Sequence, residues 1–183
     1  FFPIVAFGET IESRQLIMKP DGLLYKWVWD KSTRRVKSFD LPFTGTVKGL
    51  KQGKIRNGKR EGPWVNLNRL GQLLSKGVYK DGKKEGNWIF YHDNGQLWGK
   101  DKFKGGKNYG SHISYYDNGQ IASKGYWNNE GKKEGVWIHY HKNGKLWVQG
   151  RHNDGDHEGT WIYYHENGQL DKKVIYKNGV KTK

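Results

Sequence analysis

The feature that most constrains this chain is a short motif, Glu-Gly-x-Trp, that returns at a fixed spacing. The first two copies are 24 residues apart, and so are the last two. The middle interval is 49 residues, which is two periods plus one inserted residue. The missing copy lies at 109–112, with His112 at the tryptophan position, and the insertion falls within 128–131. A period of this length indicates an array of similar units that pack on one another. The four copies begin at Glu61, Glu85, Glu134 and Glu158.

Each unit has the pattern of a β-hairpin followed by a second turn. Residues 88–91 are aromatic and β-branched, which favours a strand. Asn94-Gly95 comes next, and this dipeptide predicts a tight primed turn, because asparagine and glycine tolerate φ > 0. Residues 96–103 return, and a glycine-rich turn at 105–107 leads into the next unit. The sequence therefore predicts an all-β fold, in which tandem hairpin repeats of ~24 residues stack into one elongated, twisted antiparallel meander sheet.

Equivalent positions of the units form columns along the predicted sheet, and neighbouring units bury these columns against one another. Which columns share a face depends on whether the Asn-Gly loop has two or three residues, since a one-residue slip exchanges the two faces. Both loop lengths stay open at this point. The first strand supplies Trp64, Trp88, Trp137 and Trp161, and the return strand supplies Leu73, Leu97, Ile121, Leu146 and Leu170.

Three regions are predicted along the chain. Residues 1–8 are apolar and end in Ala6-Phe7-Gly8, a small-x-small pattern typical of a signal-peptidase site, so they are interpreted as a signal-peptide tail. A first β-strand is the alternative. Residues 9–41 do not fit the period and are predicted to form capping strands, with 21–29 covering the open edge, and 42–183 form the repeat array. A leader would place the protein in the periplasm or outside the cell, and the alternative is the cytoplasm.

Charge and composition limit the classes of partner. The 183 residues include 33 Lys and Arg against 18 Asp and Glu, a formal net charge of +15. This balance favours partners with a negative surface, such as anionic lipid or an acidic protein. There is no cysteine, which excludes disulfides, cysteine-ligated zinc and a thiol nucleophile.

The repeated phrase YxxNGQLxxKGxYKDGKKEGxW, introduced by DGLLYKWVW and PFTG, resembles the bacterial MORN repeat variant and its YwqK-like antitoxin family. The resemblance covers roughly residues 21–181. It implies stacked hairpins in a single-layered sheet and, by family name, a protective partner of a toxin. MORN repeats more generally resemble lipid-contacting or protein-tethering modules. The copy at 108–112 departs from the pattern, because Tyr109 and His112 replace the glutamate and the tryptophan.

Two recurring columns carry titratable groups, and both are interpreted as structural. His92, His141 and His165 occupy one column at strand ends, with spacing unsuited to a shared metal. The motif glutamates form the other, and we expect them to accept hydrogen bonds from turn amides or to pair with lysines. The array shows no nucleophile with a base and an orienting group, so no enzyme, metal or cofactor is predicted.

Two functional hypotheses remain, from different classes. The first is a non-catalytic scaffold that binds a protein partner through the sheet face, as an antitoxin or immunity protein would. The second is a peripheral module that binds anionic phospholipid through a basic edge. Nucleic acid is not an expected partner, the oligomeric state stays open, and simple solvation is the alternative explanation for the turn lysines. The candidate partner-binding residues are Trp98, Trp147, Lys83, Lys84, Lys107, Lys132 and Lys133.

Overall fold

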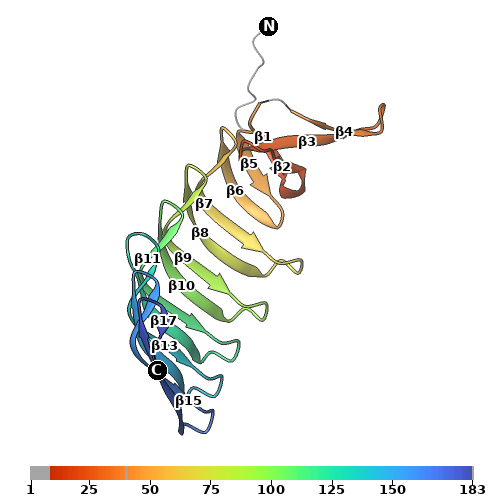
Figure 1. The fold of residues 1–183 in the computed structure, drawn as a ribbon. Helices are drawn as coiled ribbons and strands as arrows, with labels where there is room; N and C mark the ends of the chain where they lie inside the picture. Colours follow the sequence, from red (N-terminus) through yellow and green to blue (C-terminus); the bar gives the residue numbers. More distant parts are fainter. Residues whose placement is uncertain (1–8, 40, 183) are drawn as a thin grey trace. The chain divides into compact units, whose positions relative to one another are not determined.

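The computed structural model describes residues 9–39 and 41–182. The chain forms two compact units, residues 1–83 and 84–183. Both consist of β-strands and turns, with one short 3-10 turn at Ser13–Gln15 (Figure 1). No helix in these described ranges is long and apolar enough to cross a membrane.

The first unit contains two sheets. One has the strand order β1-β5-β6-β7-β8, and the other has the order β2-β3-β4. All neighbours in these sheets are antiparallel except β1 and β5, which run parallel. The strands are β1 (Glu9–Glu12), β2 (Leu16–Met18), β3 (Leu24–Asp30), β4 (Arg35–Ser38), β5 (Gly45–Lys48), β6 (Lys51–Arg56), β7 (Lys59–Leu67) and β8 (Leu73–Lys80).

The second unit is a meander in which each strand pairs with the next along the chain, always antiparallel. The predicted all-β fold of tandem hairpin repeats is therefore confirmed, with the parallel pair β1–β5 as an addition that the sequence did not predict. The strands are β9 (Lys83–Tyr91), β10 (Leu97–Lys104), β11 (Lys107–Tyr115), β12 (Ile121–Trp127), β13 (Lys133–Tyr140), β14 (Leu146–Asn153), β15 (Asp156–Tyr164), β16 (Leu170–Lys177) and β17 (Val180–Lys181).

The Asn-Gly loops are not primed turns, contrary to the sequence prediction. In the loop after β9, the Gly95 amide donates to the His92 carbonyl and the His92 amide donates to the Gln96 carbonyl. Gly95 has φ +83°, whereas Asn94 has no positive φ. These are three-residue loops, in which a type I turn is followed by a left-handed glycine. A separate β-bulge follows in the return strand, where Leu97 pairs with Tyr91 and Gly99 pairs with Phe90, so that Trp98 is the extra residue.

The primed turns lie at the opposite ends of the strands. Asp81-Gly82 and Asp154-Gly155 have positive φ at both residues, as a type I′ turn requires. The residue inserted within 128–131 converts one of these turns into a three-residue loop, closed by a bond from the Gly131 amide to the Asn128 carbonyl. The two ends of each hairpin thus use different turn chemistry, and the short turn carries the basic residues.

Tryptophan stacked on glycine forms the core. Trp64, Trp137 and Trp161 are nearly fully buried. A Cβ added to Gly150 would lie 2.1 Å from the Trp161 ring, and one added to Gly125 would lie 2.3 Å from the Trp137 ring. Only glycine fits at these places, because the indole occupies the space of a side chain.

Three predictions about the chain ends have different outcomes. The signal-peptide prediction falls on residues 1–8, which lie outside the described residues, and stays a prediction. Residues 9–41 contribute β1 to β4, and the boundary at 41/42 remains a proposal. The strand at the edge of β5 is β1, whereas the stretch 21–29 contributes β3 of the separate sheet.

Candidate partner-binding face

The motif glutamates are structural, as predicted. The Gly105 amide donates to Glu85 Oε2 at 2.8 Å, and the Asp154 amide donates to Glu134 Oε2 at 3.0 Å. The same bond recurs from the amides of Asp81 and Asn178 to Glu61 and Glu158. Each carboxylate thereby holds the short turn that follows its neighbouring strand, which accounts for its recurrence without catalysis.

The strand-end histidines are structural as well. His92 Nε2 lies 2.9 Å from the Tyr115 carbonyl, and His141 Nε2 lies 2.8 Å from the Tyr164 carbonyl. Both carbonyls belong to the next repeat. Across residues 9–39 and 41–182, no group of three or more His, Cys, Asp or Glu side chains is placed to hold a metal ion.

The irregular copy of the motif holds a buried polar chain that sequence reasoning missed. His112 Nδ1 lies 2.6 Å from Asp101 Oδ1, and His112 Nε2 lies 3.0 Å from Ser123 Oγ. Ser123 Oγ lies 2.7 Å from Ser114 Oγ. The sequence showed no nucleophile with a base and an orienting group, whereas strand pairing brings Asp101, His112 and Ser123 side by side in the core.

This polar chain fills the core position of a tryptophan and does not form an accessible active site. The side chains of His112 and Asp101 are 9% and 6% exposed, and Ser123 is buried. His112 also stacks on Trp137, with ring centroids 5.1 Å apart. Buried hydroxyls and carboxylates must be hydrogen-bonded, and here they satisfy one another within the core.

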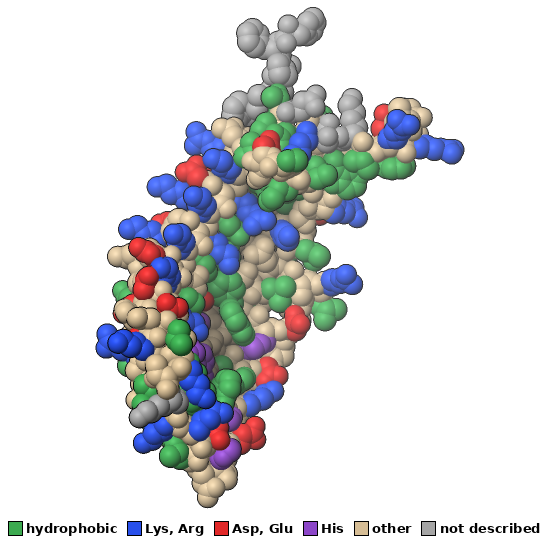
Figure 2. All heavy atoms as spheres, in the orientation of Figure 1, with side chains coloured by type: hydrophobic (Ala, Val, Ile, Leu, Met, Phe, Trp, Pro, Cys, Tyr) green, Lys and Arg blue, Asp and Glu red, His purple; other side chains and the backbone are tan. Residues whose placement is uncertain are grey.

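Aromatic side chains cover one side of the second unit, here called the aromatic face. It carries Trp88, Phe90 and Phe103 in its first strands and Trp137 and Trp161 further on. Figure 2 shows histidine side chains in purple among the green hydrophobic groups. Alternation along a strand places residues of the other parity on the opposite face. The three-residue loops and their bulges thus settle which columns share a face.

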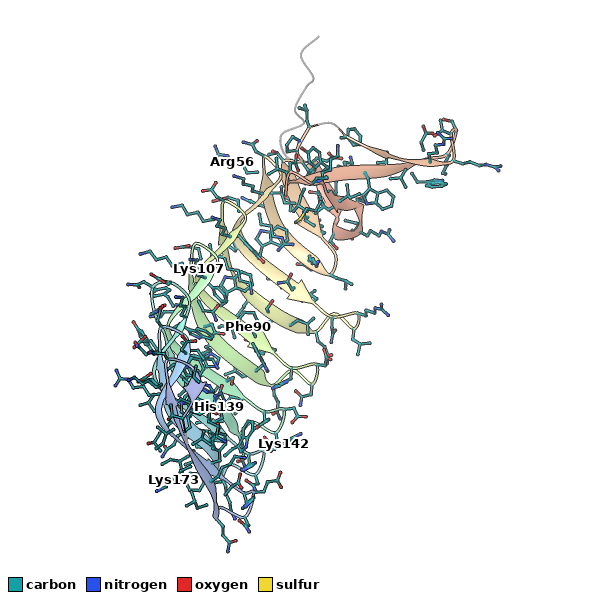
Figure 3. All side chains as sticks on the ribbon, in the orientation of Figure 1. Arg56, Phe90, Lys107, His139, Lys142 and Lys173 are labelled. Carbon is teal, nitrogen blue, oxygen red and sulfur yellow. The ribbon has the colours of Figure 1, made fainter. Side chains whose placement is uncertain are left out.

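Two tryptophans remain exposed on the aromatic face. Trp98 is 42% exposed, with its ring centroid 5.5 Å from that of Phe90. Trp147 is 46% exposed and lies 6.2 Å from the His139 ring. Both occupy the same place in repeats two apart, next to rings that hold them. Figure 3 labels Phe90 and His139, which lie one residue before the ends of β9 and β13.

Two of the five candidate lysines also lie on this face. Lys84 Nζ is 4.6 Å from the Phe90 centroid and 4.7 Å from that of Phe103. Lys133 Nζ is 4.4 Å from the Trp137 ring. Ammonium groups at such distances are attracted by aromatic rings.

The other three candidate lysines lie at the turns. Lys132 Nζ lies 2.5 Å from Asp154 and 3.5 Å from Glu130, and this pairing raises the pKa of Lys132. Lys83 and Lys107 are exposed. Figure 3 shows Lys107 at one end of the strands and Lys142 at the other. The basic edge is therefore interrupted by acidic side chains.

Burial lowers the pKa values of several bases of the aromatic face. Burial, followed by the charge of Lys133, lowers the pKa of His139 to about 4. Burial also lowers the pKa values of His152, His157 and Lys133. Sequence reasoning missed His152 because it occupies an aromatic column of the repeat, and it missed His157 because it occupies the place of Lys84 and Lys133 in other repeats.

The repeats of the second unit match a known family model. Four segments match the family model described as MORN repeat variant: residues 84–104, 109–129, 133–154 and 158–178. Together they span nearly all of the second unit, so its four tandem repeats are similar to the MORN repeat variant. Repeats of this kind form scaffolds that often bind membranes or proteins. A search of curated proteins found no match to the chain.

Proposed function

We propose that this array of MORN repeat variants is a non-catalytic scaffold that binds a protein partner through the aromatic face of its second unit. The partner relation is that of an antitoxin or immunity protein, which holds its partner by contact and performs no chemistry on it. The observation that carries the proposal is the pair Trp98 and Trp147, 42% and 46% exposed at equivalent places of two repeats.

Exposed tryptophans on a rigid strand are good contact residues. They bring a large apolar area and lose little conformational entropy on binding, and they dominate many protein interfaces. Phe90 packs edge-on against Trp98. His139 packs edge-on against Trp147 at 6.2 Å, and the His141 ring lies tilted beside it at 6.1 Å. Both anchors are thus oriented before a partner arrives, which favours affinity.

Charge supports a partner with an acidic surface. The chain carries +15 in total, and Lys84 and Lys133 lie over rings of the aromatic face. An acidic protein surface would meet both the rings and the ammonium groups. Complementary charge raises the association rate and suppresses wrong partners.

The test is capture of a partner from the native host by the immobilised chain, followed by binding measurements with the purified partner. Trp98→Ala together with Trp147→Ala should weaken binding at least ~100-fold, the range of interface anchors. Tyr126→Ala is the matched control, because Tyr126 is 48% exposed and its neighbour Trp127 belongs to the aromatic face. Equal loss in the control, or no loss in the double variant, contradicts the proposal.

Binding to anionic lipid is the second candidate, and one observation favours it. Arg56, Lys59 and Lys80 surround a hollow of about 490 Å³ at the short turns of the first unit. Each basic residue near an anionic membrane contributes on the order of 1 kcal/mol. Glu61 and Asp81 line the same hollow and oppose this attraction. Flotation with phosphatidylglycerol vesicles at low salt decides: retention there, but not on phosphatidylcholine, would support this function.

We also propose that the protein acts outside the cytoplasm. A partner outside the cytoplasm fits the proposed signal-peptide tail at 1–8, and sequencing the amino terminus of the protein purified from its host tests it.

A further inference from the structure

The aromatic face carries the same set of three side chains twice. Each member of one set lies 49 residues from its counterpart in the other, which is two periods plus the inserted residue. The two sets therefore occupy equivalent places in repeats two apart. The first set, here called the first subsite, is Lys84, Phe90 and Trp98, and the second subsite is Lys133, His139 and Trp147.

In the first subsite, the phenylalanine ring lies between the ammonium group and the exposed indole. Lys84 Nζ is 4.6 Å from the Phe90 centroid, and the Trp98 centroid is 5.5 Å from the same point. Trp98 is 42% exposed, so a ligand reaches its ring from solvent. The three groups thus form a continuous surface, with a charge at one end and an open ring at the other.

In the second subsite, the same surface lines a groove. Lys133 Nζ is 4.4 Å from the Trp137 ring, on which His139 stacks at 6.1 Å. Trp147 lies 6.2 Å from His139 and is 46% exposed. Lys133, His139 and Trp147 all line a groove of about 240 Å³, which gives a ligand access to the lysine as well as to the indole.

The fold does not require these subsites, because neighbouring repeats form the same hairpin without them. In the repeat between the two subsites, Asn108 stands at the lysine position and Ala122 at the tryptophan position. In the last repeat, these positions hold His157 and Asp171. Both repeats still form paired strands, β11–β12 and β15–β16. The subsites are therefore a surface feature of alternate repeats.

The lysines and the tryptophans form two rows across the sheet. The lysines begin at the short-turn ends of β9 and β13, whereas the tryptophans lie at the long-loop ends of β10 and β14. Four strand steps separate β10 from β14. At ~4.8 Å per step the subsites are ~19 Å apart, which an extended chain at ~3.3 Å per residue spans in about six residues. Successive side chains of such a chain point to opposite sides, so one reaches the lysine row and the next reaches the tryptophan row.

The two rows favour different side chains. In the described ranges 9–39 and 41–182, no carboxylate lies within ion-pair distance of Lys133. Its ammonium group is half-buried, and a carboxylate brought by a ligand would stabilise it. An exposed indole favours an aromatic ring, which packs against it edge-on or offset. The net charge of +15 attracts an acidic segment as a whole.

We propose that the two subsites together bind an extended acidic segment of the protein partner, which carries two acidic–aromatic pairs about six residues apart. In each pair, the carboxylate contacts the lysine of one subsite and the neighbouring aromatic ring packs on its tryptophan. The inference rests on the proposed function and adds the chemistry and the spacing that the partner presents.

The test uses the full chain and two octapeptides with blocked ends and the same composition. Glu-Phe-Ser-Thr-Ser-Thr-Glu-Phe has its pairs six residues apart, and Glu-Phe-Ser-Glu-Phe-Thr-Ser-Thr has them three apart. Titration calorimetry at pH 7.5 should give at least ~10-fold tighter binding of the first peptide, because its second pair binds intramolecularly. In the second peptide, the second pair meets the repeat that holds Asn108 and Ala122, and its side chains point to the wrong sides.

Variants identify the subsites. Trp98→Ala and Trp147→Ala should each bring the six-spaced peptide down to the affinity of the three-spaced one, because either change leaves a single subsite. Lys133→Gln should weaken the six-spaced peptide at least ~3-fold. Lys100→Gln is the matched control, since Lys100 is exposed and pairs with Ile89 on the opposite face, and it should leave the affinity unchanged. Unchanged urea midpoints show that each variant keeps its fold.

A spectroscopic readout shows whether one peptide occupies both subsites. With the tryptophans labelled with ¹⁵N, the indole N–H signals of Trp98 and Trp147 should move together and with one midpoint as the six-spaced peptide is added. In Trp98→Ala the Trp147 signal should move at a higher peptide concentration. Movement of one signal alone with the six-spaced peptide contradicts the bridging mode.

The outcomes separate this inference from the proposed function. Equal affinities of the two octapeptides overturn the two-subsite mode, even where a partner is still captured through Trp98 and Trp147. Equal binding of a six-spaced peptide with Ser for Phe overturns it in favour of a general polyanion. A concentration-dependent dimer that Trp98→Ala abolishes overturns it in favour of a second copy of this chain. Failure of partner capture refutes the proposed function by a different measurement.

Discussion

Three buried tryptophans of the array, Trp64, Trp137 and Trp161, stack on a glycine of the preceding strand, and the one histidine in that column lies beside an aspartate instead. Gly125 lies under Trp137 and Gly150 under Trp161. At the irregular copy Asp101 takes the glycine position, and His112 binds its carboxylate at 2.6 Å. The two exceptions to the repeat, His112 and Asp101, therefore depend on each other. The imidazole is smaller than an indole and leaves room for the carboxylate, and the carboxylate is the hydrogen-bond partner of the imidazole.

This pairing predicts strong coupling between positions 101 and 112. His112→Trp alone sets an indole against a carboxylate and should cost about 1–3 kcal/mol of unfolding free energy. Asp101→Gly alone leaves a buried imidazole N–H without its acceptor and should cost about 1–3 kcal/mol. The double variant restores the tryptophan-on-glycine pair, so its loss should be smaller than the sum by about 0.5–3 kcal/mol.

Urea denaturation of the wild type, both single variants and the double variant measures the coupling. Ser111→Ala, at an exposed neighbouring position, is the control and should change little. Strictly additive losses in the double variant would show that the two positions act independently.

At the scale of the elements, the recurring glutamates and loop asparagines bind backbone groups of neighbouring turns and loops. The motif glutamates accept turn amides, and the loop asparagines donate to carbonyls of the next loop, as Asn94 does to Asp117 at 2.9 Å and Asn143 does to Glu166 at 2.9 Å. The asparagine is therefore used for its amide group, and only the following glycine is required for its φ. Hairpins are marginal alone, and these bonds add to the packing between repeats.

Glu134 offers the sharpest test of this arrangement. Glu134→Ala removes the acceptor of the Asp154 amide and should lower the unfolding free energy by about 1.5–3 kcal/mol, the range for hydrogen bonds to charged groups. Glu134→Gln keeps an acceptor oxygen and should retain a large part of that stability. Hydrogen exchange at the Asp154 amide should lose protection in the alanine variant and keep most of it in the glutamine variant.

Glu130→Ala serves as the control, because Glu130 is exposed and lies 3.5 Å from Lys132 without binding a turn amide. If Glu134→Gln costs as much as Glu134→Ala, the charge rather than the hydrogen bond carries the effect.

At the scale of the whole molecule, net charge governs which partners are attracted, and burial governs how many protons the folded chain binds. The net charge of +15 keeps the chain attracted to acidic partners, while the aromatic face holds bases in their neutral form. The pKa of His139 is lowered to about 4, and those of His152 and His157 are lowered in the same direction. The folded state therefore binds fewer protons than the unfolded chain below pH 6.5.

Stability should consequently fall as the pH drops from about 6.5 towards 4. In that window the unfolded histidines take up protons, whereas folded His139 takes one up only near pH 4, so protons favour the unfolded chain. Stability is fully present above about pH 6.5. Urea midpoints at pH 7.5, 6.0 and 5.0 should decrease in that order, and His139→Gln should flatten the trend. A midpoint unchanged between pH 7.5 and 5.0 would contradict this account.

The sequence alone determined the repeat, the hairpins and the strand order, because these depend on local chemistry. Turn glycines, β-branched runs and a 24-residue period act within one unit or between neighbours. The sequence also singled out Trp98 and Trp147 as candidate contact residues and assigned the glutamate column a structural role. Only the tertiary structure decided the three-residue loops, the shared face of both tryptophans and the inward direction of Lys84 and Lys133. The tertiary structure also revealed the contact of His112 with Asp101 and the His152 nitrogen that has no partner among the described residues. Each of these depends on the register and bulges of adjacent strands, where a shift of one residue sends every side chain to the other face.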